Sequence, residues 1–235
     1  MEQTPHISFE FFPPKTEEGL LKLEHTARLL SKLNPSFFSV TFGAGGSTRT
    51  NTFEAVKYLR QACQVSVAPH LSCMEASEKT ILECLKAYEG LSIDRIVVLR
   101  GDMPSGSLGR SHFKYAKDLV AYIRKRYPTL WIEVACYPES HPESPTLQKD
   151  IAYFIEKVNC GANSAITQYF YHEDAYYYFV DKLRKAQCEI PVIPGIMPIT
   201  KVESLFRFSR ICGADLPLWL KKTLLDLQDD EKGLK

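Results

Sequence analysis

Short apolar runs recur along the chain at intervals of roughly thirty residues, the length of one strand-and-helix unit. Each run is rich in β-branched and aromatic residues, and apolar side chains occupy successive positions, as in a strand that is buried on both faces. Seven strands are predicted in this way, at residues 7–12, 37–42, 66–71, 95–99, 131–136, 164–170 and 192–197. Polar residues are sparse inside the runs and gather where the runs end.

The segments between the runs place apolar residues three or four positions apart, which is the spacing of one helix face. Four such stripes begin at Leu20, Ile81, Ala116 and Ile151. Strands buried on both faces that alternate with helices predict a parallel sheet covered by helices. The fold class is therefore predicted as α/β, a TIM-type (β/α)8 barrel that lacks the last strand–helix unit in this chain, because seven units are one short of eight. No linker or low-complexity segment interrupts residues 1–235, so a single barrel domain is expected.

Composition narrows the class of protein without naming a function. The 235 residues are 45% hydrophobic and carry a formal charge of +1, so neither nucleic acid nor a membrane is expected as a partner. Seven cysteines form no C-x-x-C pair and six histidines form no metal-ligand spacing, so no metal is expected. Because unpaired thiols and an N-terminus without a signal-peptide pattern are typical of the reducing cytosol, a cytoplasmic protein is predicted.

Polar residues follow the predicted strands one after another. In a parallel barrel the carboxyl ends of the strands carry the chemistry. The residues at these ends are Glu10, Thr41, His70, Arg100, Gly101, Asp102, Tyr137, His141 and Gln168. Each alone has an ordinary explanation, such as a satisfied core histidine or a surface ion pair. Their common placement at the ends of successive strands indicates a site.

Glu10 is the most unusual of these residues because it interrupts an apolar strand. A buried carboxylate must be hydrogen-bonded, neutralised or used. It could be an acid held by a neighbouring cation, or it could work with Asp102 as an acid–base pair. Glycosidases also use two carboxylates at barrel strand ends, so a barrel hydrolase is one rival. The amide, hydroxyl, arginine and tyrosine groups nearby favour instead a flat polar ligand such as a flavin or a pterin.

Eight stretches at these strand ends resemble the methylenetetrahydrofolate reductase family. They are SFEFFPPKTEEG (8–19), FFSVTFGAGGSTR (37–49), APHLSC (68–73), LRGDMPSG (99–106), YAKDLV (115–120), ACYPESHPES (135–144), KVNCGANSAITQYF (157–170) and IPGIMPI (193–199). They occur in family order over nearly the whole chain, and the eight together are highly specific.

The resemblance implies a flavoenzyme of one-carbon metabolism that binds FAD at the strand ends without a Rossmann motif. It implies reduction of 5,10-methylenetetrahydrofolate to 5-methyltetrahydrofolate by a ping-pong cycle, in which NADH or NADPH reduces FAD before folate receives the hydride. Glu10 is implied to deliver the proton that opens the methylene bridge, and its aromatic neighbours are expected to raise its pKa. Asp102 is implied to lie near the flavin ring and to modulate its electronics and folate binding.

Further residues match family positions that hold the cofactor or the substrate. The cofactor-binding positions are Thr41, His70, Arg100, Gly101, Asp102, Tyr115, Ala116, Ala135, Tyr137, His141, Asp150, Lys157 and Gln168. The substrate-binding positions are Glu10, Gln168 and Phe208. Arg100, Lys157 and His70 suit a pyrophosphate or a ring edge, since these groups want cations and donors.

The chain departs from the family pattern chiefly at its C-terminal end. The family continues with a helix, an eighth strand and a closing helix where this sequence ends at Lys235, so the first and last strands are expected to be unpaired edges. A non-catalytic flavin- or folate-binding barrel remnant is therefore the alternative function. The bacterial-type pattern favours NADH over NADPH, and relatives form dimers or tetramers, so a homo-oligomer is expected.

Overall fold

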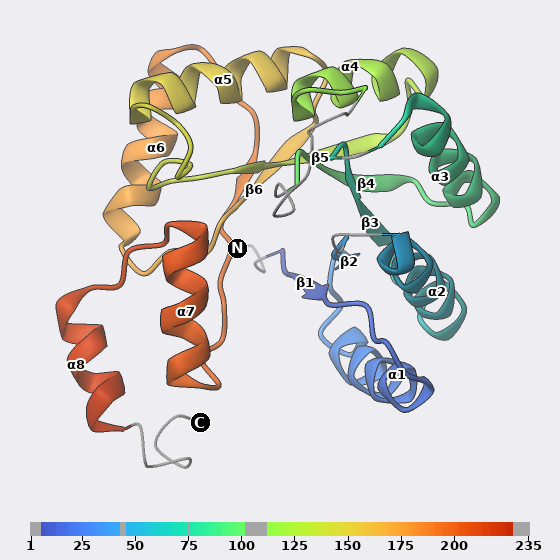
Figure 1. Cartoon of the computed structure of the whole chain (residues 1–235), viewed down its shortest axis with the longest axis horizontal. Coiled ribbons are helices and arrows are strands. Elements are labelled where there is room, and N and C mark those ends of the chain that lie inside the picture. The colour runs from blue at the N-terminus through green and yellow to red at the C-terminus, as the bar shows by residue number, and fades with distance from the viewer. Residues whose placement is uncertain (1–5, 43–45, 75, 102–111, 228–235) are drawn as a thin grey trace, which may run out of the picture. The chain divides into compact units, whose positions relative to one another are not determined.

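Strands and helices alternate along the chain in a computed structural model that describes residues 6–42, 46–74, 76–101 and 112–227 (Figure 1). The strands are β1 (Ser8–Phe11), β2 (Phe37–Val40), β3 (Val67–Ser72), β4 (Arg95–Leu99), β5 (Trp131–Cys136), β6 (Ser164–Thr167) and β7 (Val192–Ile193). The helices are α1 (Glu17–Ser31), α2 (Gly46–Ala62), α3 (Glu78–Gly90), α4 (Ala116–Arg126), α5 (Leu147–Asn159), α6 (Glu173–Lys185), α7 (Val202–Cys212) and α8 (Leu218–Asp226). The strands are hydrogen-bonded in chain order from β1 to β7, which is the order found in a (β/α) barrel.

Two compact units make up the chain, and β5 crosses the boundary between them. The N-terminal unit is Met1–Glu133 with Cys160–Ala162, and it holds β1–β4 and α1–α4. The C-terminal unit is Val134–Asn159 with Asn163–Lys235, and it holds β6, β7 and α5–α8.

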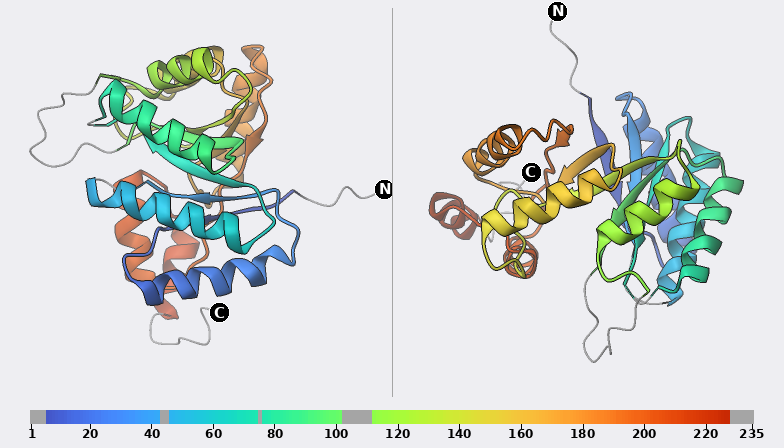
Figure 2. Two further views of the ribbon diagram at one scale, coloured as in Figure 1. Left: turned by 90° about the vertical axis from the view of Figure 1, so that its right-hand side faces the viewer. Right: turned by 90° about the horizontal axis from the view of Figure 1, so that it is seen from above.

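The N-terminal unit is a parallel sheet with helices outside it (Figure 1). Glu10 of β1 lies opposite Ser39 of β2, and His70 of β3 lies opposite Val97 of β4. Helices α1 and α2 pack side by side along this sheet (Figure 2). Thr16 begins α1, because its hydroxyl accepts a hydrogen bond from the Gly19 N–H at 3.1 Å.

Burial differs between the strands of this unit. Every residue of β2 and β3 is buried, as predicted for strands apolar on both faces, and Phe38 of β2 packs against Phe9 and Phe11 of β1. The expectation of full burial is wrong for β1, whose neighbouring Phe12 is 71% exposed. Among the described strands β1 pairs with β2 alone, so its other edge lacks a covering strand.

The C-terminal unit pairs β6 with β7 in parallel and has an apolar core of its own. Strand β7 is only two residues long because Pro194 has no N–H, and the Gly195 N–H donates to Thr167 Oγ1 at 2.8 Å instead of to a neighbouring backbone. The core contains Tyr169, Val202, Leu205, Ala214, Leu216, Leu220 and Leu224. It is therefore built mainly by the apolar faces of α7 and α8 together with the residues that follow β6.

The predicted α/β class with parallel strands and alternating helices is confirmed. All seven predicted strands are present, and the four apolar stripes lie on α1, α3, α4 and α5. Closure into a TIM-type barrel, the missing last unit and a single domain over 1–235 stay predictions. No helix in the described part of the chain is long and apolar enough to cross a membrane.

Arg124 of α4 binds the backbone carbonyl of Gly161 together with two other backbone carbonyls. Its guanidinium donates to the carbonyl oxygens of Gly161, Pro128 and Leu130 at 2.6–3.0 Å. Gly161 has φ +116°, and a Cβ there would lie 2.8 Å from Arg124 Cγ. We expect Gly161→Ala to lower the free energy of unfolding by about 1–3 kcal/mol, measured by urea titration.

Gly90→Ala is the matched control for this change. A Cβ at Gly90, the last residue of α3, meets nothing within 4 Å, so the substitution should leave the unfolding midpoint unchanged or raise it slightly. Equal effects of the two substitutions would contradict the role given to Arg124 and the positive φ.

Candidate functional site

A carboxylate and an imidazole meet where β1 and β3 end. Glu10 Oε2 lies 3.3 Å from His70 Nε2. The two groups are not aligned as a hydrogen bond, so Nε2, which is buried, has no hydrogen-bond partner among the described residues. The His70 side chain is 7% exposed and that of Glu10 is 47% exposed. The arrangement fits an acid held by a neighbouring cation when His70 is protonated, and it also leaves a buried nitrogen that a ligand can satisfy.

The pKa of Glu10 is lowered, which is opposite to the predicted direction. Burial is the largest single influence and raises the pKa, but the facing imidazole of His70 and a hydrogen bond with Ser39 together outweigh it. The aromatic neighbours on which the prediction relied do not enclose the carboxylate, since about half of its side chain reaches solvent. Glu10 is therefore ionised at neutral pH in this arrangement.

Strands β3 and β4 are locked together at their carboxyl ends. The Arg100 carbonyl accepts hydrogen bonds from Ser72 Oγ at 2.8 Å and from the Met74 N–H at 3.0 Å. Gly101 follows with φ +86°, and a Cβ there would lie 2.2 Å from Ser72 Oγ. Glycine is thus required at position 101 by the fold itself, whether or not a ligand contacts it.

The remaining predicted positions of the N-terminal unit are less constrained. The Thr41 carbonyl accepts a hydrogen bond from Thr52 Oγ1 at 2.9 Å. The Thr41 hydroxyl has no hydrogen-bond partner within the described residues. Tyr115 is 45% exposed at the start of α4, where its N–H donates to Asp118 Oδ2 at 2.9 Å. Ala116 is buried beside it. Asp102, predicted as catalytic, lies outside the described residues.

Lys157 is a desolvated cation of the C-terminal unit. Its Nζ donates to the carbonyl oxygen of Ala135 on β5. Burial lowers the pKa of Lys157, whereas Cys136 and Asp150 act in the opposite direction. Burial also raises the pKa of the Cys136 thiol to about 12, so Cys136 is neutral and gives Lys157 no countercharge. Because a desolvated ammonium gains from an anion, this position is suited to one.

The loop before α5 is ordered by a carboxylate. Asp150 accepts hydrogen bonds from the His141 N–H at 3.1 Å and from Ser144 Oγ at 2.7 Å. His141 Nδ1 in turn accepts from the Glu143 N–H at 3.1 Å, which assigns the proton of the neutral ring to Nε2. The ring packs edge-on against Tyr137 at 4.6 Å. Asp150 thus positions His141 and Tyr137, and its carboxylate is already satisfied.

Gln168 and Phe208 are joined by Tyr169, which sequence reasoning did not single out. The Tyr169 N–H donates to Gln168 Oε1 at 3.0 Å, and the Tyr169 ring stacks on that of Phe208 with 6.2 Å between centroids. A cavity of about 10 Å³ is lined by Tyr137, Gln168 and Tyr169, among others. The C-terminal unit therefore brings Tyr137 and Gln168 to one cavity and links Phe208 to it through Tyr169.

Two further polar residues escaped prediction. Ser39 hydrogen-bonds Glu10, and Ser72 fixes the end of β4. The available signal was a serine inside an otherwise apolar strand, as in Phe37-Phe38-Ser39-Val40. Within the described ranges no cluster of three histidine, cysteine, aspartate or glutamate side chains could hold a metal ion. The chemistry assembled here is that of a carboxylate, imidazoles, a desolvated cation and aromatic rings.

Solved structures with a similar fold are very different in sequence. One is a putative phosphonomutase from Burkholderia cenocepacia J2315, with a TM-score of 0.56 and 12% identity over 80% of this chain and 76% of that one. Another is 2,3-dimethylmalate lyase, a member of the PEP mutase/isocitrate lyase superfamily, with a TM-score of 0.56 and 8% identity over 97% and 83%. At these identities the likeness concerns the fold alone.

Relatives by sequence carry a consistent name. The 5,10-methylenetetrahydrofolate reductase of Buchnera aphidicola subsp. Schizaphis graminum is 40% identical over 95% of this chain and 75% of its own length. That of Escherichia coli (strain K12) is 36% identical over 98% and 77%. The Methylenetetrahydrofolate reductase (NADH) 1 of Arabidopsis thaliana is 34% identical over 97% of this chain and 41% of its own length. The family model for methylenetetrahydrofolate reductase matches residues 1–235, so this chain belongs to that family and is an oxidoreductase that reduces methylenetetrahydrofolate.

Proposed function

We propose that the chain reduces 5,10-methylenetetrahydrofolate to 5-methyltetrahydrofolate with electrons from NADH or NADPH, by a ping-pong cycle through bound FAD. The observation that carries the proposal is the Glu10–His70 pair, a carboxylate and a buried imidazole at strand ends of a chain from this reductase family. When bound, FAD supplies hydride transfer, taking a hydride from the nicotinamide and giving it to the one-carbon unit.

The described residues fit a flavin dinucleotide in their chemistry. The buried Nε2 of His70 has no hydrogen-bond partner among the described residues, and the desolvated ammonium of Lys157 gains from an anionic group such as a pyrophosphate. The residues assigned to FAD are Thr41, His70, Arg100, Gly101, Asp102, Tyr115, Ala116, Ala135, Tyr137, His141, Asp150, Lys157 and Gln168. Asp150 contributes through the loop that it orders rather than through a free carboxylate.

Glu10 is assigned the proton that opens the methylene bridge of folate. An ionised carboxylate cannot donate, so Glu10 must take up a proton before this step. Its exposed side chain makes that change available, because a bound folate would exclude water from it and strengthen the burial effect that already raises its pKa. Gln168 and Phe208 are assigned to the folate and nicotinamide, and Asp102 is assigned a catalytic role in modulating the electronics of the flavin and the binding of folate.

NADH is the proposed electron donor, and the cytoplasm is the proposed compartment. The Arabidopsis relative is named for NADH, which supports NADH as the donor here. All seven cysteines are free thiols, which supports a reducing cytoplasm.

The absorption spectrum of the purified chain tests the cofactor directly. We expect a visible flavin band that bleaches on anaerobic addition of NADH and returns when methylenetetrahydrofolate is added. A band that NADH does not bleach would favour the non-catalytic remnant, which nothing in the fold favours at present. A protein that stays colourless when FAD is supplied would contradict the proposed function.

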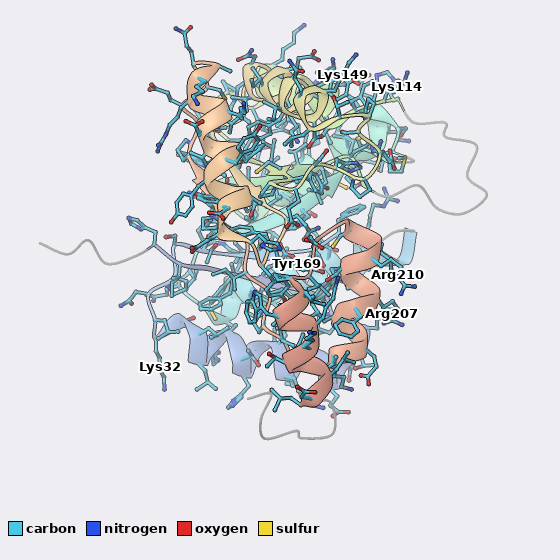
Figure 3. All side chains as sticks on the ribbon, turned by 90° about the vertical axis from the view of Figure 1, so that its left-hand side faces the viewer. Lys32, Lys114, Lys149, Tyr169, Arg207 and Arg210 are labelled. Carbon is cyan, nitrogen blue, oxygen red and sulfur yellow. The ribbon has the colours of Figure 1, made fainter. Side chains whose placement is uncertain are left out.

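Lys157→Met gives a residue-level version of this test. After gel filtration we expect the FAD content of this variant to be about one tenth of that of the unchanged chain or lower, because a charge-assisted contact to an anion is lost. Its FAD-free form should unfold at the same temperature or higher, since a desolvated charge has been removed. Lys149→Met, on the exposed face of the same helix, is the control and should retain FAD normally (Figure 3). Loss of both stability and FAD in Lys157→Met would instead indicate a structural lysine.

A further inference from the structure

Tyr169 is buried in the core of the C-terminal unit but carries a hydroxyl that the core does not need. Tyr169 is 6% exposed and lies among Val202, Leu205 and other apolar side chains. Packing alone would be served by phenylalanine, and burying a hydroxyl is unfavourable unless it finds a partner. The structure supplies partners for it, so the hydroxyl has a specific task.

Those partners lie on α7. The Tyr169 hydroxyl is 2.9 Å from Ser209 Oγ, and Cys212 Sγ donates to it at 3.3 Å. Burial raises the pKa of Tyr169, so the group stays a neutral phenol that can both donate and accept. Ser209 is itself 3% exposed, whereas Arg207 and Arg210 on either side of it are on the exposed face of α7 (Figure 3). The hydroxyl pair therefore fixes the rotation of α7 about its own axis.

Two residues assigned to folate and nicotinamide depend on this arrangement. Phe208 is adjacent to Ser209, is 43% exposed, and stacks on the Tyr169 ring with 16° between planes. Gln168 precedes Tyr169, and its Oε1 is held by the Tyr169 N–H. Residue 169 thus contacts both groups: its buried ring stacks on Phe208 of α7, and its backbone N–H holds the Gln168 amide that follows β6.

We propose that Tyr169 is a positioning residue for the reductase: its hydroxyl, paired with Ser209, sets α7 so that Phe208 is presented to the folate and the nicotinamide, while its backbone N–H holds the Gln168 amide. The inference rests on the proposed function for its ligands. The arrangement of Tyr169, Ser209 and Phe208, called the clamp below, is a property of the apoprotein. Tyr169 touches neither substrate nor cofactor in this role, and acts through its two neighbours.

The kinetic test uses Tyr169→Phe and Ser209→Ala, which each remove one hydroxyl of the pair. Each should raise the KM for methylenetetrahydrofolate about three- to tenfold, the equivalent of one neutral hydrogen bond, and the double variant should be no worse than the more affected single variant. FAD content should not change. Tyr171→Phe is the matched control: its hydroxyl donates to the Met197 carbonyl at 3.3 Å in the same core and is not part of the Tyr169–Ser209 pair, so KM should stay the same. An unchanged KM in Tyr169→Phe, with a loss of stability equal to that of Tyr171→Phe, would overturn the proposal.

A second readout does not require activity and separates the clamp from the function. With Phe208→4-fluorophenylalanine, the ¹⁹F resonance should be shifted by the stacked Tyr169 ring, and it should move towards the solvent-exposed value in Ser209→Ala and in Tyr169→Phe but not in Tyr171→Phe. A resonance that stays in place in both clamp variants overturns the proposal even if the enzyme is active. A resonance that moves as expected in a protein without flavin or turnover supports the clamp and refutes only the proposed function.

Discussion

Glu10→Gln is expected to abolish the folate half-reaction while leaving the nicotinamide half-reaction intact. Glutamine keeps the size of the side chain and its contact with Ser39 and His70, but it cannot supply a proton to the bridging nitrogen. Loss of a general acid costs about 10²–10⁴-fold in rate. Stopped-flow absorbance would follow flavin bleaching by NADH and, in a separate mixing, its reappearance with methylenetetrahydrofolate. Only the second rate should fall.

Glu24→Gln is the control for removing a carboxylate. Glu24 lies on α1, where it pairs with Arg28 at the surface, so both half-reactions should be unaffected. If Glu10→Gln slowed flavin reduction by NADH as much as flavin reoxidation, Glu10 would be a general structural residue of the site and not its acid.

Because the pKa of Glu10 is lowered in the ligand-free protein, Glu10 can act as the acid only if bound folate raises that pKa. In the ligand-free protein Glu10 should titrate below 4.5, the value for an unperturbed glutamate, and the bound folate should move that titration upwards. NMR of a protein with ¹³C-labelled glutamate, with and without a non-reactive folate analogue, would follow the carboxyl carbon. A Glu10 titration that ligand binding leaves in place would assign the proton to another donor.

Glu133→Gln should lower the free energy of unfolding strongly. Glu133 of β5 has no exposed surface, pairs with the Arg95 guanidinium and accepts from Trp131 Nε1 at 3.0 Å. Arg95 lies over the rings of Phe37 and Trp131, at 4.6 and 4.8 Å from their centroids, and its side chain is 23% exposed. Breaking a fully buried pair from one side costs about 3–5 kcal/mol, and the partial exposure of Arg95 places the expected loss at the lower end of that range. Chemical denaturation followed by circular dichroism would measure the loss.

Two comparisons make that result interpretable. Glu18→Gln removes a pair with Lys22 whose side chains are both about three-quarters exposed, and it should change stability by no more than about 0.5 kcal/mol. Replacing both partners at once, as Glu133→Leu with Arg95→Met, should recover most of the loss because no charge is left buried. A loss below about 1 kcal/mol in Glu133→Gln would show that the exposed part of the Arg95 side chain is enough to hydrate its charge.

The strands were predictable because their signal is local. A parallel strand covered on both faces is apolar at nearly every position, so runs such as Phe37–Val40 and Arg95–Leu99 are visible without knowledge of their neighbours. Strand β7 shows the limit of this signal. The run at 192–197 is apolar throughout, but only Val192–Ile193 form ladder bonds, because Pro194 lacks a donor and Gly195 bonds to a side chain.

The site was predictable as a set of positions and not as a set of contacts. Strand ends identify Glu10 and His70 separately, while the 3.3 Å between them depends on the register of β1, β2 and β3. The direction of the Glu10 pKa shift depends on that same contact, which is why its aromatic neighbours in sequence misled the prediction. Tyr169 could not be separated from an ordinary core aromatic, since its partners Ser209 and Cys212 are 40 and 43 residues further along.

The hydrogen bond between Tyr169 and Gln168 also imposes a chemical polarity on any molecule that reaches this amide. The Tyr169 N–H takes one of the two lone pairs of Oε1, so the two hydrogens of the –NH₂ group are the larger share of what Gln168 still offers. A keto oxygen or an unprotonated ring nitrogen is complementary to those hydrogens, whereas an amino group or a protonated ring nitrogen finds only the remaining lone pair. The backbone of residue 169 therefore biases this amide towards acceptors among heterocycles that differ only in tautomer or in an oxo-for-amino exchange.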